Sequence, residues 1–175
     1  MRRRLLRLAG LTAAFAWALV TATPLMAQPT PTPSNAETFL RLAYSSTVLQ
    51  ARAAELAASR DTRPEVRAFA RRMVEFRREQ GAKLLAVARE RQLAVPPIPE
   101  FEHRIVLENL EPLDFLALSR RYAEVQVQAL EQELQGYAGG EGSPDEWVRT
   151  VARDTRPHLQ QFLEEARQVR QIIGP

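Results

Sequence analysis

Apolar residues recur at intervals of three or four along four long segments of the chain, and arginine and glutamate fill most positions between them. This spacing places the apolar side chains on one face of an α-helix. It predicts helices over about residues 36–59, 64–93 and 113–137, and a fourth from residue 144 to the end of the chain. We therefore expect an all-α fold, a four-helix bundle with one core over residues 36–173.

Polar and glycine-rich stretches mark the predicted helix ends. In DTRP, residues 61–64, either of the first two residues can cap a helix, and Pro64 fits its first turn. The glycine-rich YAGGEGSP, residues 137–144, predicts the end of the third helix. Ser143 and Glu146 have the spacing of a capping box, which predicts the start of the fourth helix.

Prolines shape the rest of the chain. Four of them in AVPPIPEFEHRIVLENLEPLD, residues 94–114, predict a long crossing connection between helices two and three, with one helical turn near 102–110. Pro157 falls inside the last helix and is expected to kink or break it. PEVRAFAR (64–71) and PDEWVRTVAR (144–153) are similar, which fits two helical hairpins related by a pseudo-twofold axis. Chance similarity between arginine- and alanine-rich helices explains this pattern equally well.

The N-terminus has the layout of a secretory signal peptide. Residues 1–27 contain four arginines near the start, a short apolar run and small residues that end at Ala27. We expect cleavage before Gln28, followed by a proline-rich tether over residues 28–35. The apolar run is short for a membrane anchor, and Arg2 with Arg3 weakly resembles a twin-arginine signal. The predicted location is the periplasm, with association with the outer membrane as a further option.

The charge balance argues against nucleic acid as a partner. The whole chain has 24 basic and 21 acidic residues, but four of the arginines lie in residues 1–27. Subtracting these four leaves 20 basic against 21 acidic residues, a net charge of −1. Positive and negative side chains alternate along each helix, whereas a nucleic-acid interface needs basic charge on one face. The chain has no cysteine, so no disulfide stabilises it in an oxidising compartment.

A family resemblance extends over roughly residues 36–172. The residues that carry it are Phe39, Leu56–Ala57, PEVRAFARRMV (64–74), YAEVQV (122–127), Pro157 and Leu159. At these positions the chain resembles an exported bacterial family, domain of unknown function 4142. The resemblance implies a ferritin-like four-helix bundle, in which a glutamate and three histidines on facing helices are suited to binding a metal.

The positions that this resemblance assigns to the metal ligands are Gln50, Arg77, Leu130 and Phe162. None of these side chains is a good ligand, because arginine has no lone pair to donate and leucine and phenylalanine offer only packing. The metal site of the family is therefore expected to be lost, and we predict no metal and no cofactor. We expect Arg77 to hydrogen-bond to Gln50 or a nearby glutamate, or to extend toward solvent.

The other candidate ligands are interpreted as surface residues. His103 follows Glu100 at a spacing seen in di-iron bundles, but this pair lies in the connection and has no second copy. The remaining candidates are His158 and two carboxylate pairs, Glu75 with Glu79 and Glu131 with Glu133. The pairs have arginine or glutamine nearby, which indicates ordinary pairing on helix surfaces. No phosphate-binding loop, nucleophile elbow or zinc-ligand spacing occurs in the chain.

These observations favour a protein that is not an enzyme. The predicted function is a structural or interaction role in the cell envelope, with an envelope protein or a membrane surface as partner. The alternative is a ferritin-like, metal- or stress-linked envelope protein that uses unconventional ligands. Trp147, Tyr137 and Tyr44 are candidate contact aromatics, and burial in the core is the other interpretation of each.

Overall fold

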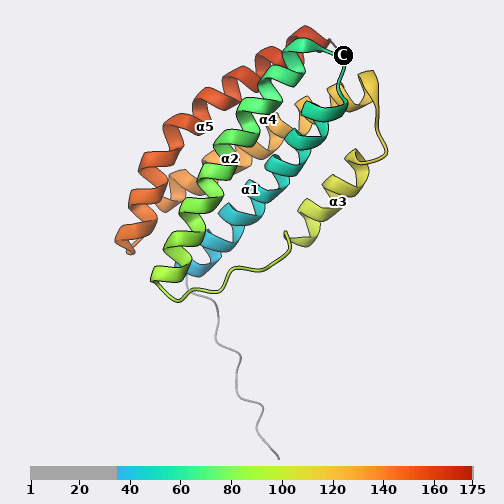
Figure 1. Ribbon diagram of the computed structural model, residues 1–175. Helices are drawn as coiled ribbons and strands as arrows, with labels where there is room; N and C mark the ends of the chain where they lie inside the picture. Colours follow the sequence, from blue (N-terminus) through green and yellow to red (C-terminus); the bar gives the residue numbers. More distant parts are fainter. Residues whose placement is uncertain (1–34, 175) are drawn as a thin grey trace, which may run out of the picture. The chain divides into compact units, whose positions relative to one another are not determined.

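Five helices account for most of residues 35–174, which are the residues that the structure, a computed structural model, describes. They are α1 (Asn35–Arg60), α2 (Pro64–Glu90), α3 (Phe101–Leu110), α4 (Phe115–Gly140) and α5 (Glu146–Ile173), shown in Figure 1. No strand occurs within these residues, so the predicted all-α class is confirmed. The predicted signal segment, residues 1–27, and the tether up to residue 34 lie outside the described part of the chain.

The four long helices pack as two hairpins that share a core. α1 packs along α2, and α4 packs along α5, while α1 also contacts α4 and α2 contacts α5. The short helix α3 lies beside this bundle, against α1 and α4 (Figure 1). Within residues 35–174, no helix has an apolar stretch long enough to cross a bilayer.

The apolar faces of the long helices form the core. Leu40 of α1, Phe69 and Leu84 of α2, Leu118 of α4 and Leu159 of α5 are all fully buried. Burying one such side chain contributes about 1.5–3 kcal/mol, so these helices are held mainly by their apolar faces. α1 also buries several alanines, whose small side chains allow the neighbouring helices to approach closely.

The turn between α1 and α2 is held by a buried aspartate. One oxygen of Asp61 accepts a hydrogen bond from the backbone N–H of Arg63 at 2.9 Å, and the other accepts one from the Ser119 hydroxyl at 2.6 Å. Pro64 occupies the first turn of α2 as predicted, but Arg63 is the N-cap residue and its side chain makes no capping bond. Asp61 therefore joins the first hairpin to α4 instead of capping α2.

Two predicted helix ends on either side of the α4–α5 turn are wrong. α4 continues through the glycines to Gly140. A Cβ atom at Gly140 would lie only 2.9 Å from the Phe39 ring, so glycine is needed here for packing between helices and does not end α4. α5 begins at Glu146 after Asp145, and Ser143 accepts a hydrogen bond from the Asp145 backbone N–H. The predicted capping box is therefore absent from this turn.

The long connection between α2 and α4 is confirmed, although it contains more helix than the predicted single turn, because α3 has ten residues. The start of α3 is fixed to α1 through Glu100. Its carboxylate pairs with Arg41 at 2.9 Å, and its backbone N–H donates to the Ser45 hydroxyl at 2.8 Å. These side-chain bonds involve residues more than fifty positions apart, so helical spacing alone does not indicate them.

The last helix is not broken at Pro157. α5 is continuous from Glu146 to Ile173 with Pro157 inside it. Proline cannot donate to the carbonyl four residues earlier, which belongs to Arg153. Both residues are exposed, so water can reach that side of the helix and the loss of one bond is tolerated there.

Candidate functional site

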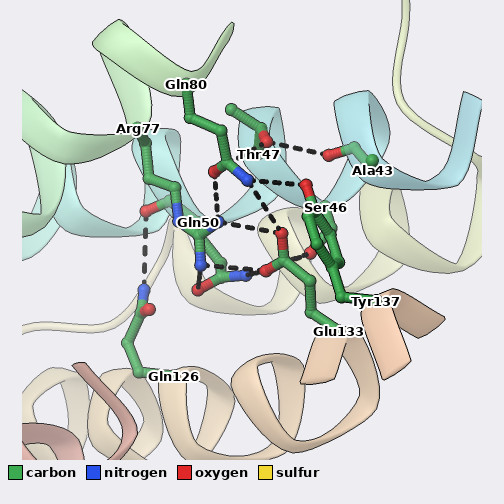
Figure 2. A network of polar contacts seen from close by, with 9 residues as sticks. All are labelled: Ala43, Ser46, Thr47, Gln50, Arg77, Gln80, Gln126, Glu133 and Tyr137. Atoms are coloured by element: carbon green, nitrogen blue, oxygen red, sulfur yellow. Dashed lines mark hydrogen bonds and ion pairs between the residues drawn. The ribbon is translucent and has the colours of Figure 1, made fainter. Parts of the chain in front are cut away.

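A buried ion pair lies at the centre of the bundle, between Arg77 of α2 and Glu133 of α4. The two side chains are 0% and 2% exposed. One guanidinium nitrogen, Nη2, lies 2.9 Å from Oε2 of the carboxylate, and the other, Nη1, lies 3.0 Å from Oε1 (Figure 2). This two-pronged geometry suits an arginine and a carboxylate particularly well. Each charge is therefore neutralised by the other without help from solvent.

Two glutamines bridge both members of this pair. Gln50 of α1 accepts a hydrogen bond from Arg77 Nη2 at 2.6 Å and donates to Glu133 Oε2 at 2.8 Å. Gln80 of α2 accepts one from Arg77 Nη1 and donates to Glu133 Oε1 at 3.3 Å (Figure 2). An amide group is suited to this position because its oxygen faces the cation and its NH2 group faces the anion. The network therefore links α1, α2 and α4 through fixed polar contacts.

Hydroxyl groups extend the network at its edge. Ser46 accepts a hydrogen bond from Gln50 at 3.0 Å, Thr47 donates to Gln80 at 3.2 Å, and Gln80 donates to the Tyr137 hydroxyl at 2.8 Å. Burial is the main cause that raises the pKa of Tyr137, and the nearby Glu133 carboxylate raises it further. Tyr137 is therefore neutral at physiological pH. It contributes hydrogen bonding here and is not a base.

Some buried polar atoms of the centre have no hydrogen-bond partner within residues 35–174. They are Arg77 Nε, Gln126 Oε1 and Tyr122 Oη. The Arg77 guanidinium lies over the Phe76 ring, 5.0 Å from its centroid, and this contact partly compensates the cation. Burial also raises the pKa of Tyr122 well above its usual value, so its hydroxyl stays protonated. Neither tyrosine supplies an ionised group to the centre.

The four positions assigned by the family resemblance are only partly brought together. Gln50 and Arg77 are in direct contact, which confirms the expected hydrogen bond and excludes the alternative that Arg77 extends toward solvent. Leu130 is fully buried one turn before Glu133. Phe162 is half-buried and stacks on Phe76, with 4.7 Å between the ring centroids. The last two positions therefore contribute apolar packing.

The surface interpretation of Glu133 is wrong. Glu133 lies three residues after Leu130 and four before Tyr137, so it occupies the same buried stripe of α4. Gln80 has the equivalent position on α2, three residues after Arg77 and four before Leu84. Helical spacing could have identified both residues if polar side chains had been allowed on the core face.

The other carboxylate candidates behave largely as surface residues. Glu131 is exposed and pairs with Arg167 of α5 at 2.9 Å, across two helices and not along one. This hydrogen bond is the main cause that raises the pKa of Arg167. Glu75 and Glu79 are exposed on α2, and His158 is exposed on α5, as predicted.

His103 differs from its predicted surface position. It is partly buried on α3, and its Nδ1 lies 2.7 Å from the Ser45 hydroxyl oxygen. Burial lowers the pKa of His103, although a hydrogen bond with Ser45 and the neighbouring carboxylates Glu100, Glu102 and Glu133 oppose this effect. His103 is therefore predominantly neutral at pH 7. Between residues 35 and 174, no three histidine or carboxylate side chains gather as a metal-binding group.

Two of the candidate contact aromatics belong to the core. Tyr137 and Trp147 are buried, and the Phe39 ring lies edge-on against both, with centroid distances of 5.2 and 6.1 Å. Tyr44 is partly buried and packs against the same core. These aromatic contacts join the beginning of α1 to the α4–α5 turn, next to the polar network.

Comparison with known proteins identifies a family for most of the chain. Neither the curated proteins nor the solved structures give a match. A family model described as a domain of unknown function (DUF4142) matches residues 21–169. This match includes the whole of α1 to α4, most of α5, and therefore both members of the buried ion pair. The chain belongs to the DUF4142 family.

Proposed function

We propose that this protein is an exported, non-catalytic helical bundle of the cell envelope with a structural or protein-interaction role. In this proposal, the Arg77–Glu133 network takes the place of the metal centre that the family resemblance suggests. The observation that carries the proposal is the two-pronged, fully buried contact between these two side chains. It joins α2 to α4 and engages Gln50 and Arg77, two of the four positions that the family resemblance assigns to metal ligands.

The chemistry of the centre supports a structural role. Arg77 has no lone pair to donate, so it cannot coordinate a metal. The Glu133 carboxylate accepts hydrogen bonds from Arg77, Gln50 and Gln80, so its lone pairs are already engaged. A general base needs an acceptor that is free to take a proton from a substrate. The described centre offers none, because its tyrosines are protonated and its carboxylate is held by the arginine.

Two features support export and interaction. The arginines, apolar run and small residues of positions 1–27 have the order of a signal peptide. Large apolar side chains are also exposed on and around α3, which is a common property of interaction surfaces. These are Ile98, Phe101, Ile105, Phe115 and Leu116.

Adding metal ions tests the proposal that the Arg77–Glu133 network has a structural role and binds no metal. Adding iron(II), zinc, copper(II) or manganese(II) to the purified chain should leave its melting temperature unchanged, because a ligand without affinity for the folded state cannot stabilise it. Differential scanning calorimetry would measure this. A variant with both Arg77→His and Leu130→His is the positive control, since it places two imidazoles near Glu133 and should gain a zinc-dependent rise. A saturable rise in the unaltered chain that Glu133→Gln abolishes would instead support the metal-linked alternative.

Mass analysis tests the proposed export. When the full-length chain is expressed in a bacterium with two membranes, the envelope fraction should contain a product that begins at Gln28. Intact-mass spectrometry of that fraction would identify the new N-terminus. Ala27→Phe is the control, because signal cleavage requires a small residue just before the cut, and this variant should keep residues 1–27. An unaltered chain that retains Met1 in the inner membrane would rule out a cleaved signal.

A further inference from the structure

A cleft of about 470 Å³ opens beside the polar network, between the first half of α1 and the second half of α4. Its walls include Phe39 and Leu42 of α1 and Ala129 of α4, and Val148 of α5 contributes at one end. A volume of about 300–1,000 Å³ with mainly apolar walls is typical of sites for small molecules. Leu42 is 49% exposed at this cleft, so its side chain is accessible to an apolar ligand there.

α4 presents two exposed glycines, Gly136 and Gly139, along the wall of the cleft. A Cβ atom added at Gly136 or Gly139 would meet nothing within 4 Å. Packing therefore does not require glycine at these two positions, in contrast to Gly140, where Phe39 leaves no room. Glycine inside a helix costs about 0.5–1 kcal/mol relative to alanine. Both glycines line the cleft, so α4 presents bare backbone to it at these two positions.

Polar side chains line the cleft as well as apolar ones. Ser46, His103 and Glu133 all line it, together with the walls described above. Nδ1 of His103 is engaged by Ser45, and its Nε2 makes no hydrogen bond to any residue between 35 and 174. The Ser46 hydroxyl donates its proton to Glu133 Oε2 at 3.3 Å and accepts one hydrogen bond, from Gln50, so it can still accept one from a ligand. A ligand can therefore form hydrogen bonds with both side chains.

The polar lining of the cleft has no uncompensated charge. Arg77 compensates Glu133 through the two-pronged contact. His103 is predominantly neutral at pH 7 for the reasons given above. A charged head group would lose its hydration here without gaining a free counter-ion, which is costly, whereas a neutral hydroxyl or carbonyl group could exchange its bonds to water for bonds to the protein.

We propose that this cleft binds a neutral amphiphilic small molecule. Its apolar chain lies between Phe39 and Leu42 and the glycine wall of α4, and its hydroxyl head donates to Ser46 and meets His103. This inference goes beyond the envelope role proposed above and does not depend on export, because binding is measured on the purified chain. Failure of the export test would therefore leave it intact, and its own failure would leave the export proposal intact.

Three probes with the same eight-carbon chain test the ligand class: 1-octanol, octanoate and octylammonium. Isothermal titration calorimetry with the purified full chain at pH 7 should show saturable binding of 1-octanol. Octanoate and octylammonium should each bind at least about tenfold more weakly, because their charge must be desolvated without a partner. No saturable binding of 1-octanol would overturn the proposal. Binding of octylammonium as tight as that of 1-octanol would overturn the neutral ligand class.

Matched variants locate the site. Gly136→Leu should fill the cleft and reduce the affinity for 1-octanol at least about tenfold, since the apolar contact is replaced by a protein side chain. Ala138→Leu is the control, because Ala138 is exposed on the same helix and does not line the cleft. Leu42→Asn provides a second test at an exposed position where the fold tolerates change, and it should also weaken binding. Unchanged affinity in a folded Gly136→Leu or Leu42→Asn variant would place the binding elsewhere and overturn the proposal.

Discussion

Glu133→Ala should lower the free energy of unfolding by about 3–5 kcal/mol, as expected when one partner of a buried ion pair is removed. The Arg77 side chain is 0% exposed, so its charge would stay inside the bundle without the carboxylate. Gln50 and Gln80 would also lose an acceptor. Urea denaturation at pH 7 would measure the change.

The matched control for this prediction is Glu131→Ala. Glu131 lies two residues earlier on α4 and pairs with Arg167, but both side chains are exposed. Exposed ion pairs contribute little to stability because water solvates their charges almost as well as the partner does. Glu131→Ala should therefore have a much smaller effect than Glu133→Ala. If the two variants lost the same stability, the Arg77 charge would have to reach solvent in the variant, and the network would not be a closed part of the core.

A double replacement separates the destabilisation caused by an unpaired buried charge from the net contribution of the ion pair to stability. Arg77→Met combined with Glu133→Leu removes both charges and keeps apolar volume in the centre. Such replacements of buried ion pairs are often neutral or stabilising. The double variant should therefore recover at least about half of the stability lost in Glu133→Ala. Gln50 and Gln80 would lose partners, which limits the recovery.

We therefore expect the ion pair to contribute more to the unique alignment of the helices than to the free energy of unfolding. Its geometry requires α2 and α4 to face each other at one register, because both guanidinium nitrogens must meet both carboxylate oxygens. Gln50 adds the same requirement for α1. Apolar side chains tolerate small sliding movements of helices better than a two-pronged polar contact does. This supports a fixed framework in which the neighbouring cleft keeps its shape.

Helical spacing predicted much of the fold because each long helix buries one continuous face. The end of α1 and the start of α2 follow from the DTRP turn, where proline and aspartate act locally. The end of α4 could not be predicted in this way, because Gly140 is explained by the close approach of the Phe39 ring, about a hundred residues away in sequence, and not by a helix end. The length of α3 also depends on distant contacts, from Arg41 and Ser45 of α1.

The sequence indicated one member of the central ion pair, Arg77, but not its partner, Glu133. Arg77 stands out because it is a charged residue on an otherwise apolar stripe, and a partner had to exist for it. The identity of that partner was not evident, since the chain has many glutamates and most of them lie on helix surfaces. Glu133 and Glu131 differ in the face of α4 on which they lie. Glu133 lies on the buried face with Leu130 and Tyr137, whereas Glu131 lies on the exposed face and pairs with Arg167.

The second large effect concerns the two apolar residues at the ligand positions suggested by the family. Leu130→Ala should destabilise the protein by about 2–5 kcal/mol, because the residue is fully buried and its removal leaves a cavity. Phe162→Ala should cost less than the about 3–5 kcal/mol expected for a fully buried phenylalanine, since Phe162 is only half-buried. Its stacking on Phe76 adds about 0.5–1.5 kcal/mol that the variant would lose.

Thermal and urea unfolding of both variants would test this order, with Leu116→Ala as the control for truncating a partly exposed leucine of α4. Leu116→Ala should be nearly neutral, because its side chain is 39% exposed and little apolar area leaves the core. Should Phe162→Ala prove more costly than Leu130→Ala, the contact between α5 and Phe76 would be a larger part of the core than its exposure indicates. The apolar centre of the bundle would then extend beyond Leu130 to the α2–α5 interface.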